Sequence, residues 1–309
     1  MILIRNSFKD YKIRGSVVAI GNFDGIHIGH KSVIDEAKRI AKESEKKISV
    51  LTFEPHPKCF FKNRKVNFRI TPFRDKFEMI KKLEIDYYLN FNFNHNFSNI
   101  SANKFIKNIL VKELQVHHVV TGFDFVFGNK QEGDTNLLIN ESKKNLFKFT
   151  LVKEKKLKEK IKISSSEIRK NLKVGNLKKV KDILGRNWHI KSRVMRGKKL
   201  ASKIGFPTAN LKIDKYCKLC FGVYKVLVIY KRNGDATKFE GIANYGIKPT
   251  FNGIEPILEV NIFNFNKVIY HEYLEVFFIS FIRKEKKFNN FKELKNQIEE
   301  DVRICKELG

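Results

Sequence analysis

Two histidines stand out as residues that could carry chemistry, and they lie in the glycine-rich stretch that runs from Gly21 to His30. His27 and His30 are separated by two residues, and the glycines around them let the backbone approach a ligand closely. Imidazoles beside a phosphate can donate hydrogen bonds to oxygens that gain negative charge in a transition state. Because the stretch offers no evident hydrolytic nucleophile, this chemistry suits transfer of a nucleotidyl group without a covalent enzyme intermediate.

A strand, a turn and a helix must position the histidines. The apolar run of residues 17–20 precedes the stretch, and apolar residues at helical spacing, from Val33 to Ala41, follow it. Such a unit places unpaired N–H groups and the positive end of a helix dipole beside the turn. Since open α/β sheets bind phosphates there, the pattern favours a nucleotide site over two histidines that only pack or cap.

His56 is a candidate at the end of the next predicted strand. It follows the apolar run of residues 48–53 and stands between Pro55 and Pro57. The prolines stop the strand and hold a loop at its carboxyl end, where open α/β sheets bind ligands. A structural histidine is the alternative.

Asp124 and Phe125 follow another predicted strand, residues 116–121, in a segment bracketed by Gly122 and Gly128. Glycines that flank aromatic residues and a carboxylate can form a wall against a planar ring. A turn with core aromatics is the alternative.

A cluster of hydroxyl groups opens a later helix. Arg169 follows Ser164, Ser165 and Ser166 within one helical turn. Serines at a helix start satisfy its first N–H groups and can also hydrogen-bond phosphate oxygens, while the arginine neutralises charge. The pattern is therefore a candidate phosphate site, with helix capping alone as the alternative.

The order of elements predicts two domains. Alternating strands and helices favour an α/β doubly wound, Rossmann-like nucleotidyltransferase domain over residues 1–186. Beyond Trp188 the pattern changes to segments of strand length, which predict a small antiparallel β-barrel over residues 187–309. Apolar positions from Leu294 to Cys305 predict a final helix packed on that barrel. The barrel strands expected are residues 221–230, 239–245, 258–265 and 274–282.

Thr208 and Asn210 are candidate metal ligands in the second domain. They belong to the sequence Gly-Phe-Pro-Thr-Ala-Asn, which begins at Gly205, and they follow Pro207, which limits the backbone. A hydroxyl and an amide oxygen two residues apart suit a hard cation that bridges ATP phosphates. Loop chemistry without a metal is the alternative.

Composition limits the possible partners. With 309 residues and 42% hydrophobic content the chain can fill two cores. Its formal net charge of +29 would suit nucleic acid or a membrane surface, but lysines are spread over almost every segment. We therefore expect phosphorylated small molecules as partners, with no nucleic acid and no membrane. Nothing in the pattern specifies an oligomeric state.

A cytoplasmic location is expected. Four cysteines do not form a disulfide framework, and the lone pair Cys217 and Cys220 lacks the second ligand pair of a zinc site. The N-terminus lacks the apolar core of a signal peptide, and no apolar run is long enough to span a membrane.

The first half resembles a known family. The stretch from Gly21 to His30 resembles the ATP-binding signature of the nucleotidylyltransferase superfamily, in the form most similar to the bacterial bifunctional riboflavin kinase/FMN adenylyltransferase (FAD synthetase) family. The run from Ile163 to Arg169 resembles the family's second ATP signature, whereas Val126 stands where the family often has arginine. The resemblance implies that His27, His30 and Arg169 are catalytic. It also implies ATP contacts from Gly21, Phe23, Asp24, Gly25, Gly29, Ser165 and Ser166, and flavin contacts from Pro55, His56, Asp124 and Phe125.

The second half resembles riboflavin kinases through the Gly205 to Asn210 sequence, Gly-Val-Tyr at 222–224 and Lys-Pro-Thr-Phe at 248–251. This resemblance implies that Mg²⁺ binds Thr208 and Asn210 and that Glu259 is the catalytic base, an exposed strand glutamate being the alternative. ATP or flavin contacts are further implied for Gly205, Pro207, Thr208, Asn210 and Arg283. The chain departs from the family pattern at Ala201, Ser202, Asn261 and His271.

The resemblance implies two consecutive transfers. ATP phosphorylates riboflavin to FMN in the C-terminal domain, and a second ATP adenylates FMN to FAD in the N-terminal domain with release of pyrophosphate. Two alternatives stay open at this point. A class I aminoacyl-tRNA synthetase shares the His-x-Gly-His pattern, although no Lys-Met-Ser-Lys-Ser-like loop is present. A flavin-binding or regulatory protein that has lost one activity would share both halves.

Overall fold

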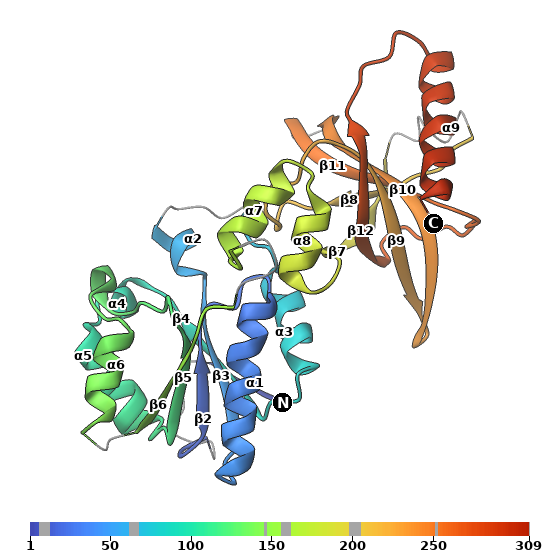
Figure 1. Cartoon of the computed structure of the whole chain (residues 1–309). Helices are drawn as coiled ribbons and strands as arrows, with labels where there is room; N and C mark the ends of the chain where they lie inside the picture. The colour runs from blue at the N-terminus through green and yellow to red at the C-terminus, as the bar shows by residue number, and fades with distance from the viewer. Residues whose placement is uncertain are drawn as a thin grey trace. The chain divides into compact units, whose positions relative to one another are not determined.

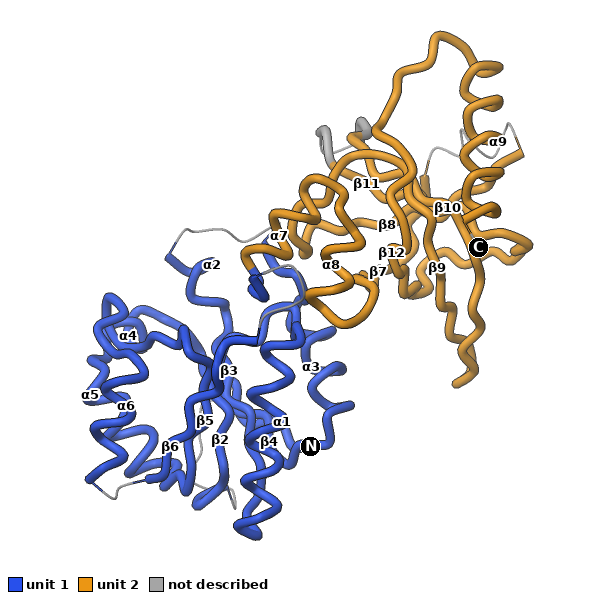
Figure 2. Tube along the Cα trace, viewed as in Figure 1, with its two compact units in different colours: residues 1–165 blue, residues 166–309 orange. Residues whose placement is uncertain are grey.

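The computed structural model describes residues 1–5, 13–61, 68–144, 147–155, 162–197, 205–250 and 253–308. It divides into two compact units, residues 1–165 and 166–309, which Figure 2 colours separately. Each unit is described by itself. Ala201 and Ser202, two of the departures from the family pattern, lie outside the described residues.

A six-stranded parallel sheet is the centre of the first unit. In chain order its strands are β1 (Ile2–Arg5), β2 (Val17–Ile20), β3 (Ile48–Glu54), β4 (Tyr87–Asn92), β5 (His118–Gly122) and β6 (Lys148–Val152). They lie side by side in the order β1-β4-β3-β2-β5-β6. Figure 1 labels β2 to β6 of this sheet. Strands β2 and β3 are buried along almost their whole length, as expected where helices cover both faces of a parallel sheet.

Helices form the outer layers of this unit. They are α1 (Ile28–Glu43), α2 (Pro57–Phe61), α3 (Phe73–Lys81), α4 (His95–Ser98), α5 (Ala102–Lys104), the π-helix η1 (Phe105–Glu113), the 3₁₀ turn η2 (Asn129–Gln131) and α6 (Thr135–Ser142). Val17 of β2 joins Val33 of α1 in one hydrophobic core, while Val18 joins Phe105 of η1 in another. Because successive side chains of a strand point to opposite faces, one strand anchors both layers. The predicted doubly wound fold is confirmed.

The strand order reverses between β2 and β5. From β2 the chain builds β3 and β4 on one side of the sheet, and β5 and β6 on the other. In open α/β sheets this reversal marks the crevice that binds ligands, at the carboxyl ends of the strands. Residues 21–27, 55–57 and 123–128 leave the sheet at those ends.

The second unit contains a closed antiparallel barrel. Its strands are β7 (His189–Met195), β8 (Ala209–Lys212), β9 (Gly222–Arg232), β10 (Asp235–Thr250), β11 (Gly253–Ile262) and β12 (Tyr273–Lys284). They close in the order β10-β11-β8-β7-β12-β9. Helix α9 (Phe291–Glu307) packs on the barrel through Cys305, which is fully buried beside Val223 and Ile242. The predicted barrel and closing helix are confirmed.

Two barrel strands lie outside the four segments expected from the sequence. Strand β7 alternates buried Ile190 and Val194 with exposed charged residues, and it therefore has a low apolar content. Strand β8 has only four residues and includes Asn210, for which the sequence analysis predicts no strand. Pairing with longer neighbours stabilises both strands.

The compact units divide before the boundary expected from the sequence. Helices α7 (Ser165–Lys173) and α8 (Leu177–Leu184) cluster with the barrel from Ser166 onward. The backbone N–H of Cys220 donates to the carbonyl oxygen of Leu172 at 2.9 Å, which ties α7 to the barrel segment. The boundary between residues 186 and 187 rests on a change of periodicity, and it stays a prediction.

Candidate active sites

The two histidines meet at the start of α1. His27 is the N-cap residue, and its Nδ1 accepts a hydrogen bond from the backbone N–H of His30 at 3.1 Å. The two imidazole rings stack with centroids 3.5 Å apart and planes inclined by 17°. Because Nδ1 of His27 accepts, the neutral ring carries its proton on Nε2, a donor suited to a phosphate oxygen. The helix N-terminus favours negative charge at the same point.

The turn before these rings has an unusual backbone. Phe23 and Ile26 have φ angles of 48° and 41°, values that side-chain-bearing residues seldom adopt, and each is 1% exposed. The carboxylate of Asp24 accepts hydrogen bonds from the backbone N–H groups of Ile70 and Thr71, both at 3.0 Å. Burial and these bonds hold the turn in its conformation. Asp24 therefore holds the turn against the backbone of the segment at Ile70 and Thr71. Its expected ATP contact stays a prediction.

Glycines leave room for the rings. A Cβ atom on Gly29 would lie 3.2 Å from Nδ1 of His27, and one on Gly21 would lie 3.1 Å from the ring of Phe23. Gly25 has a φ angle of 93°, which favours glycine. The glycines at these positions therefore leave space for the rings of His27 and Phe23. The sequence alone does not show these close contacts.

Ser165 connects the second ATP signature to the turn. Its hydroxyl donates to the carbonyl oxygen of Asp24 at 2.7 Å. Ser166 and Arg169 follow on α7, which belongs to the second compact unit. Their positions at the phosphates therefore stay predictions.

The expected flavin-side residues show structural contacts of their own. His56 is 5% exposed, its Nδ1 accepts from the backbone N–H of Lys58 at 3.1 Å, and its ring meets that of Phe68 edge-on at 5.1 Å. Pro55 beside it is exposed. The bond to Lys58 is the structural role that the sequence left as the alternative for His56, and a flavin contact stays a prediction.

Phe125 stacks on Phe127 at the end of β5, with ring centroids 5.5 Å apart and planes inclined by 14°. Phe127 is buried, whereas Asp124 is exposed and Phe125 is half-buried. This gives an aromatic face backed by the core with a carboxylate next to it. Val126, where the family often has arginine, is 46% exposed.

In the second unit, Asn210 and Glu259 are paired directly across β8 and β11. Opposed residues of neighbouring strands project from the same side of the sheet, so an amide and a carboxylate stand next to each other there. The side-chain N–H of Asn261 donates to the carbonyl oxygen of Pro207 at 2.7 Å, which ties the segment before Thr208 to β11. Asn261, a departure from the family pattern, thus helps to position the expected metal ligands. Gly205 opens the segment with a φ angle of 92°.

Comparison with known families gives two matches, one for each half of the chain. A model of FAD synthetase matches residues 9–167, and a model of riboflavin kinase matches residues 184–308. The bifunctional riboflavin kinase/FMN adenylyltransferase of Buchnera aphidicola subsp. Schizaphis graminum is 39% identical over 309 residues, covering 99% of this chain and 98% of the relative. This chain belongs to the bifunctional riboflavin kinase/FMN adenylyltransferase family.

Other relatives agree with this membership. The enzyme of the same name from Bacillus subtilis is 38% identical, with 93% of this chain and 90% of the relative covered. A solved structure described as a macrolide-efflux protein from Streptococcus pneumoniae superposes with a TM-score of 0.87 at 30% identity, covering 99% of each chain. Within the part of the chain that the structure describes, no helix has the length and apolarity needed to cross a membrane.

Membership in the family assigns both transferase activities to the chain and excludes the aminoacyl-tRNA synthetase alternative. We call residues 1–165 the adenylyltransferase unit, because the FAD synthetase model matches residues 9–167, and residues 166–309 the kinase unit, because the riboflavin kinase model matches residues 184–308. These names denote the compact units alone, since Ser166 and Arg169 of the second unit belong to the second ATP signature.

Gly197 of the kinase unit lies against the candidate ligand Asn210, a contact that the sequence analysis did not predict. A Cβ atom at this position would overlap the side-chain amide of Asn210. The only sequence signal is its place in the basic run Arg-Gly-Lys-Lys from Arg196.

We expect Gly197→Ala to lower riboflavin kinase activity by about 100-fold, because a displaced catalytic or metal-binding group can cost that much. The reason is that the added methyl overlaps the side-chain amide of Asn210, which must then shift from its position on the strand opposite Glu259. FMN formation from riboflavin measures the effect, and FAD formation from added FMN is the internal control. Unchanged FMN formation would contradict the importance of this close approach.

Arg283 has a structural partner. Its Nε and Nη2 donate to the two carboxylate oxygens of Asp301 on α9, at 2.8 and 2.7 Å, and the Asp301 side chain is 2% exposed. Arg283 lies on β12, paired with Val223 of β9, and not on the strands that carry Asn210 and Glu259. The structure therefore does not bring Arg283 into the Asn210–Glu259 pair, and its expected ligand contact stays a prediction.

We expect Arg283→Met to lower the free energy of unfolding of the kinase unit by about 3–5 kcal/mol, because it removes the positively charged partner of the buried Asp301 carboxylate, which keeps a hydrogen bond from the side-chain amide of Gln297. Loss of riboflavin kinase activity as a function of urea concentration would measure the change in the free energy of unfolding. The double variant Arg283→Met/Asp301→Leu should recover most of the lost stability. A single variant as stable as the wild type would show that the pair contributes little.

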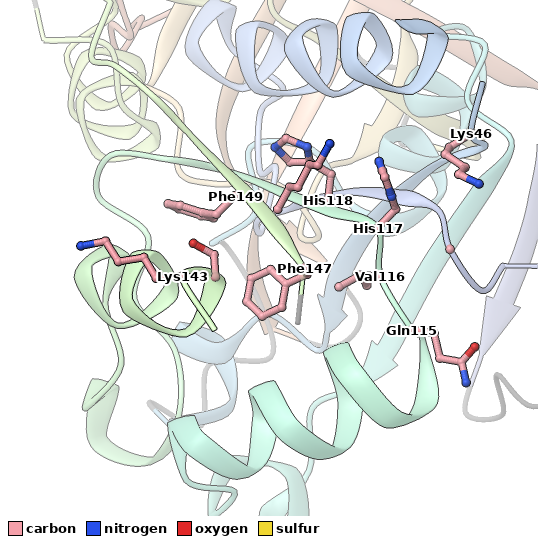
Figure 3. A pocket seen from close by; sticks show the side chains of 11 residues that line it. Lys46, Gln115, Val116, His117, His118, Lys143, Phe147 and Phe149 are labelled. Atoms are coloured by element: carbon pink, nitrogen blue, oxygen red, sulfur yellow. The ribbon is translucent and has the colours of Figure 1, made fainter. Parts of the chain in front are cut away.

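A cavity of about 730 Å³ lies at the opposite end of the parallel sheet from the histidine turn. Figure 3 shows the side chains that line it. Its lining includes His117 and His118 at the amino end of β5, with Phe147 and Lys148 at the amino end of β6. Burial lowers the pKa of His118 to about 4, and its Nε2 lies 2.8 Å from Oγ1 of Thr150. Because the candidate residues stand at the carboxyl ends of the strands, we assign this cavity to neither transfer.

Proposed function

We propose that the adenylyltransferase unit joins AMP from ATP to FMN at the histidine turn. A phosphate oxygen of FMN attacks the α-phosphorus of ATP, the bond from that phosphorus to the oxygen bridging the β-phosphorus breaks, and pyrophosphate leaves. His27 and His30 donate hydrogen bonds to the α-phosphate as its negative charge grows. The observation that carries this proposal is the stacked imidazole pair at the N-terminus of α1.

We further propose that the glycine turn and Ser165 hold the phosphates of ATP, while Phe125 and the loop after β3 hold the flavin. The aromatic face of Phe125, supported by Phe127, suits a planar ring. Arg169 and Ser166 would supply positive charge and hydrogen bonds from the start of α7.

In the kinase unit we propose that Glu259 accepts the proton of the terminal ribityl hydroxyl of riboflavin while that oxygen attacks the γ-phosphorus of ATP. ADP then leaves with the electrons of the broken bond. The pairing of Glu259 with Asn210 supports separate roles for the two residues, because a base then stands beside a group that can hold a metal–nucleotide complex.

The donor set fits Mg²⁺. Thr208 offers a hydroxyl oxygen and Asn210 offers an amide oxygen, and oxygen ligands are the kind that Mg²⁺ prefers. When bound, the cation would neutralise charge on the ATP phosphates. Among the described residues, no group of three or more histidine, cysteine or acidic side chains is placed to hold a metal ion.

Small-molecule substrates and a reducing compartment such as the cytoplasm complete the proposal. The four cysteines form no disulfide bond in the structure. The excess of positive charge would then attract ATP and FMN rather than a polymer.

A time course with riboflavin, ATP and Mg²⁺ tests the function. FMN should appear first and FAD with pyrophosphate later, and omission of Mg²⁺ should stop both. Supplying FMN in place of riboflavin should bypass the first step. Accumulation of FMN without FAD would favour the alternative in which one activity has been lost.

A further inference from the structure

A lysine is buried inside the adenylyltransferase unit, on a helix that the proposed mechanism does not use. Lys76 of α3 has an exposed fraction of 0%. It shares the helix face of Phe73, Phe77 and Ile80, which is otherwise apolar. Burial of an ammonium group costs stability unless partners compensate for the lost water. An apolar side chain would fill the same position at lower cost, so the charge needs another explanation.

The contacts of Lys76 connect both candidate substrate segments. Its Nζ donates to the carbonyl oxygen of Asn22 at 3.3 Å and lies 4.0 Å from Oε2 of Glu54. Asn22 belongs to the turn that leads to His27, whereas Glu54 ends β3 immediately before Pro55. One buried ammonium group therefore contacts the start of each segment.

Neighbouring bonds strengthen this connection. Arg69, which is 8% exposed, pairs with the other carboxylate oxygen of Glu54. The backbone N–H groups of Ile70 and Thr71 hold the carboxylate of Asp24, as described above. The segment from Arg69 to Lys76 is thus bonded to the histidine turn and to the end of β3.

We propose that Lys76 is a positioning residue for adenylyl transfer, which sets the spacing between the turn that binds ATP and the segment that binds FMN. The proposal rests on the adenylyltransferase function proposed for this unit. Reaction requires an FMN oxygen and the α-phosphorus to stand in line at short distance, so the spacing between the two segments acts on turnover more than on the binding of either substrate.

Electrostatics make the role testable. Burial and the nearby Arg69 lower the pKa of Lys76 to about 8, and the negative charges of Glu54 and Asp24 only partly oppose them. The folded-state pKa lies below the unfolded value, so the charged ammonium lowers the stability of the fold near neutral pH and this cost disappears as pH rises. A neutral side chain of similar size at position 76 should therefore not lower the melting temperature.

The first test compares Lys76→Met with Lys81→Met, an exposed lysine on the same helix. We expect Lys76→Met to lower kcat for FAD formation by about 10- to 100-fold with KM values for ATP and FMN changed less than about threefold, since misplacement acts on the reaction geometry. The melting temperature should be equal to or above that of the wild type, FMN formation should not change, and Lys81→Met should match the wild type.

The second test uses pH and a permanent charge. As pH rises through about 8, Lys76 loses its proton and kcat for FAD formation by the wild type should fall. Lys76→Arg should keep activity well above that of Lys76→Met and should show no such fall up to about pH 10, because a guanidinium group stays protonated.

Two outcomes would overturn the proposal. A Lys76→Met variant with the kcat of the wild type would show that the contacts of Lys76 with Asn22 and Glu54 are not needed for the reaction. A lower melting temperature with equal losses of FAD formation and FMN formation would show that Lys76 has a purely structural role. If the wild type itself formed no FAD, the proposed function would fail before this inference is tested.

Discussion

Replacement of His30 by alanine should lower FAD formation by about 100- to 1,000-fold, the range seen when one donor to a developing oxyanion is removed. The ring of His30 stacks on that of His27 with centroids 3.5 Å apart, so the substitution removes a donor and the support of its neighbour. FMN formation from riboflavin should not change, because Asn210 and Glu259 lie in the other compact unit. Chromatography of flavin products from FMN plus ATP, and from riboflavin plus ATP, measures the two activities separately.

His117→Ala is the matched control. It removes an imidazole from the same unit, at the amino end of β5 and beside the cavity that we assign to neither transfer. Both activities should stay near the wild-type level. Loss of both activities in a folded His30→Ala protein would contradict the assignment of adenylyl transfer to one unit and of phosphorylation to the other. A loss of FAD formation in His117→Ala equal to that in His30→Ala would indicate that the site lies at the opposite end of the sheet.

The second large effect concerns Glu259. Glu259→Gln should lower FMN formation by about 100- to 10,000-fold, the contribution typical of a general base, since the amide keeps the size of the side chain but cannot accept the proton. FAD formation from added FMN should continue at the wild-type rate. A coupled assay of ADP release with riboflavin as acceptor would measure the first activity.

Glu272→Gln, an exposed glutamate just before β12, is the control for loss of one negative charge from the barrel. It should leave FMN formation unchanged. If Glu259→Gln kept full kinase activity, the exposed-strand alternative for that glutamate would stand.

Much of the fold follows from local patterns. An apolar run, glycines and apolar residues at helical spacing were enough to predict β2, the turn and α1, because each of these elements is specified by neighbours in sequence. The change after Trp188 from helical periodicity to apolar segments of strand length was enough to predict a small antiparallel barrel. Strand β8 was missed because four residues carry too little periodicity, and only its partners make it a strand.

Side-chain partners were much less accessible from the sequence. The sequence did not predict that Asp24 accepts hydrogen bonds from the backbone of Ile70 and Thr71, or that Arg283 pairs with Asp301. The ligand contacts expected for Asp24 and Arg283 stay predictions. Lys76 left one signal that was not used, a charged residue on the apolar face of its helix. Such partners come from distant parts of the chain, so no local spacing records them.

The amino-acid sequence alone determined the types of chemistry available to this protein: two imidazoles at a helix start, and an amide and a carboxylate in a β-rich domain. These depend on residue identity and short-range spacing, which a sequence displays directly. The tertiary structure decided which of them meet. The pairing of Asn210 with Glu259 depends on the register between β8 and β11, and the bond between Lys76 and Asn22 spans 54 positions of the chain. Such contacts arise only when burial of the apolar surfaces brings distant segments together.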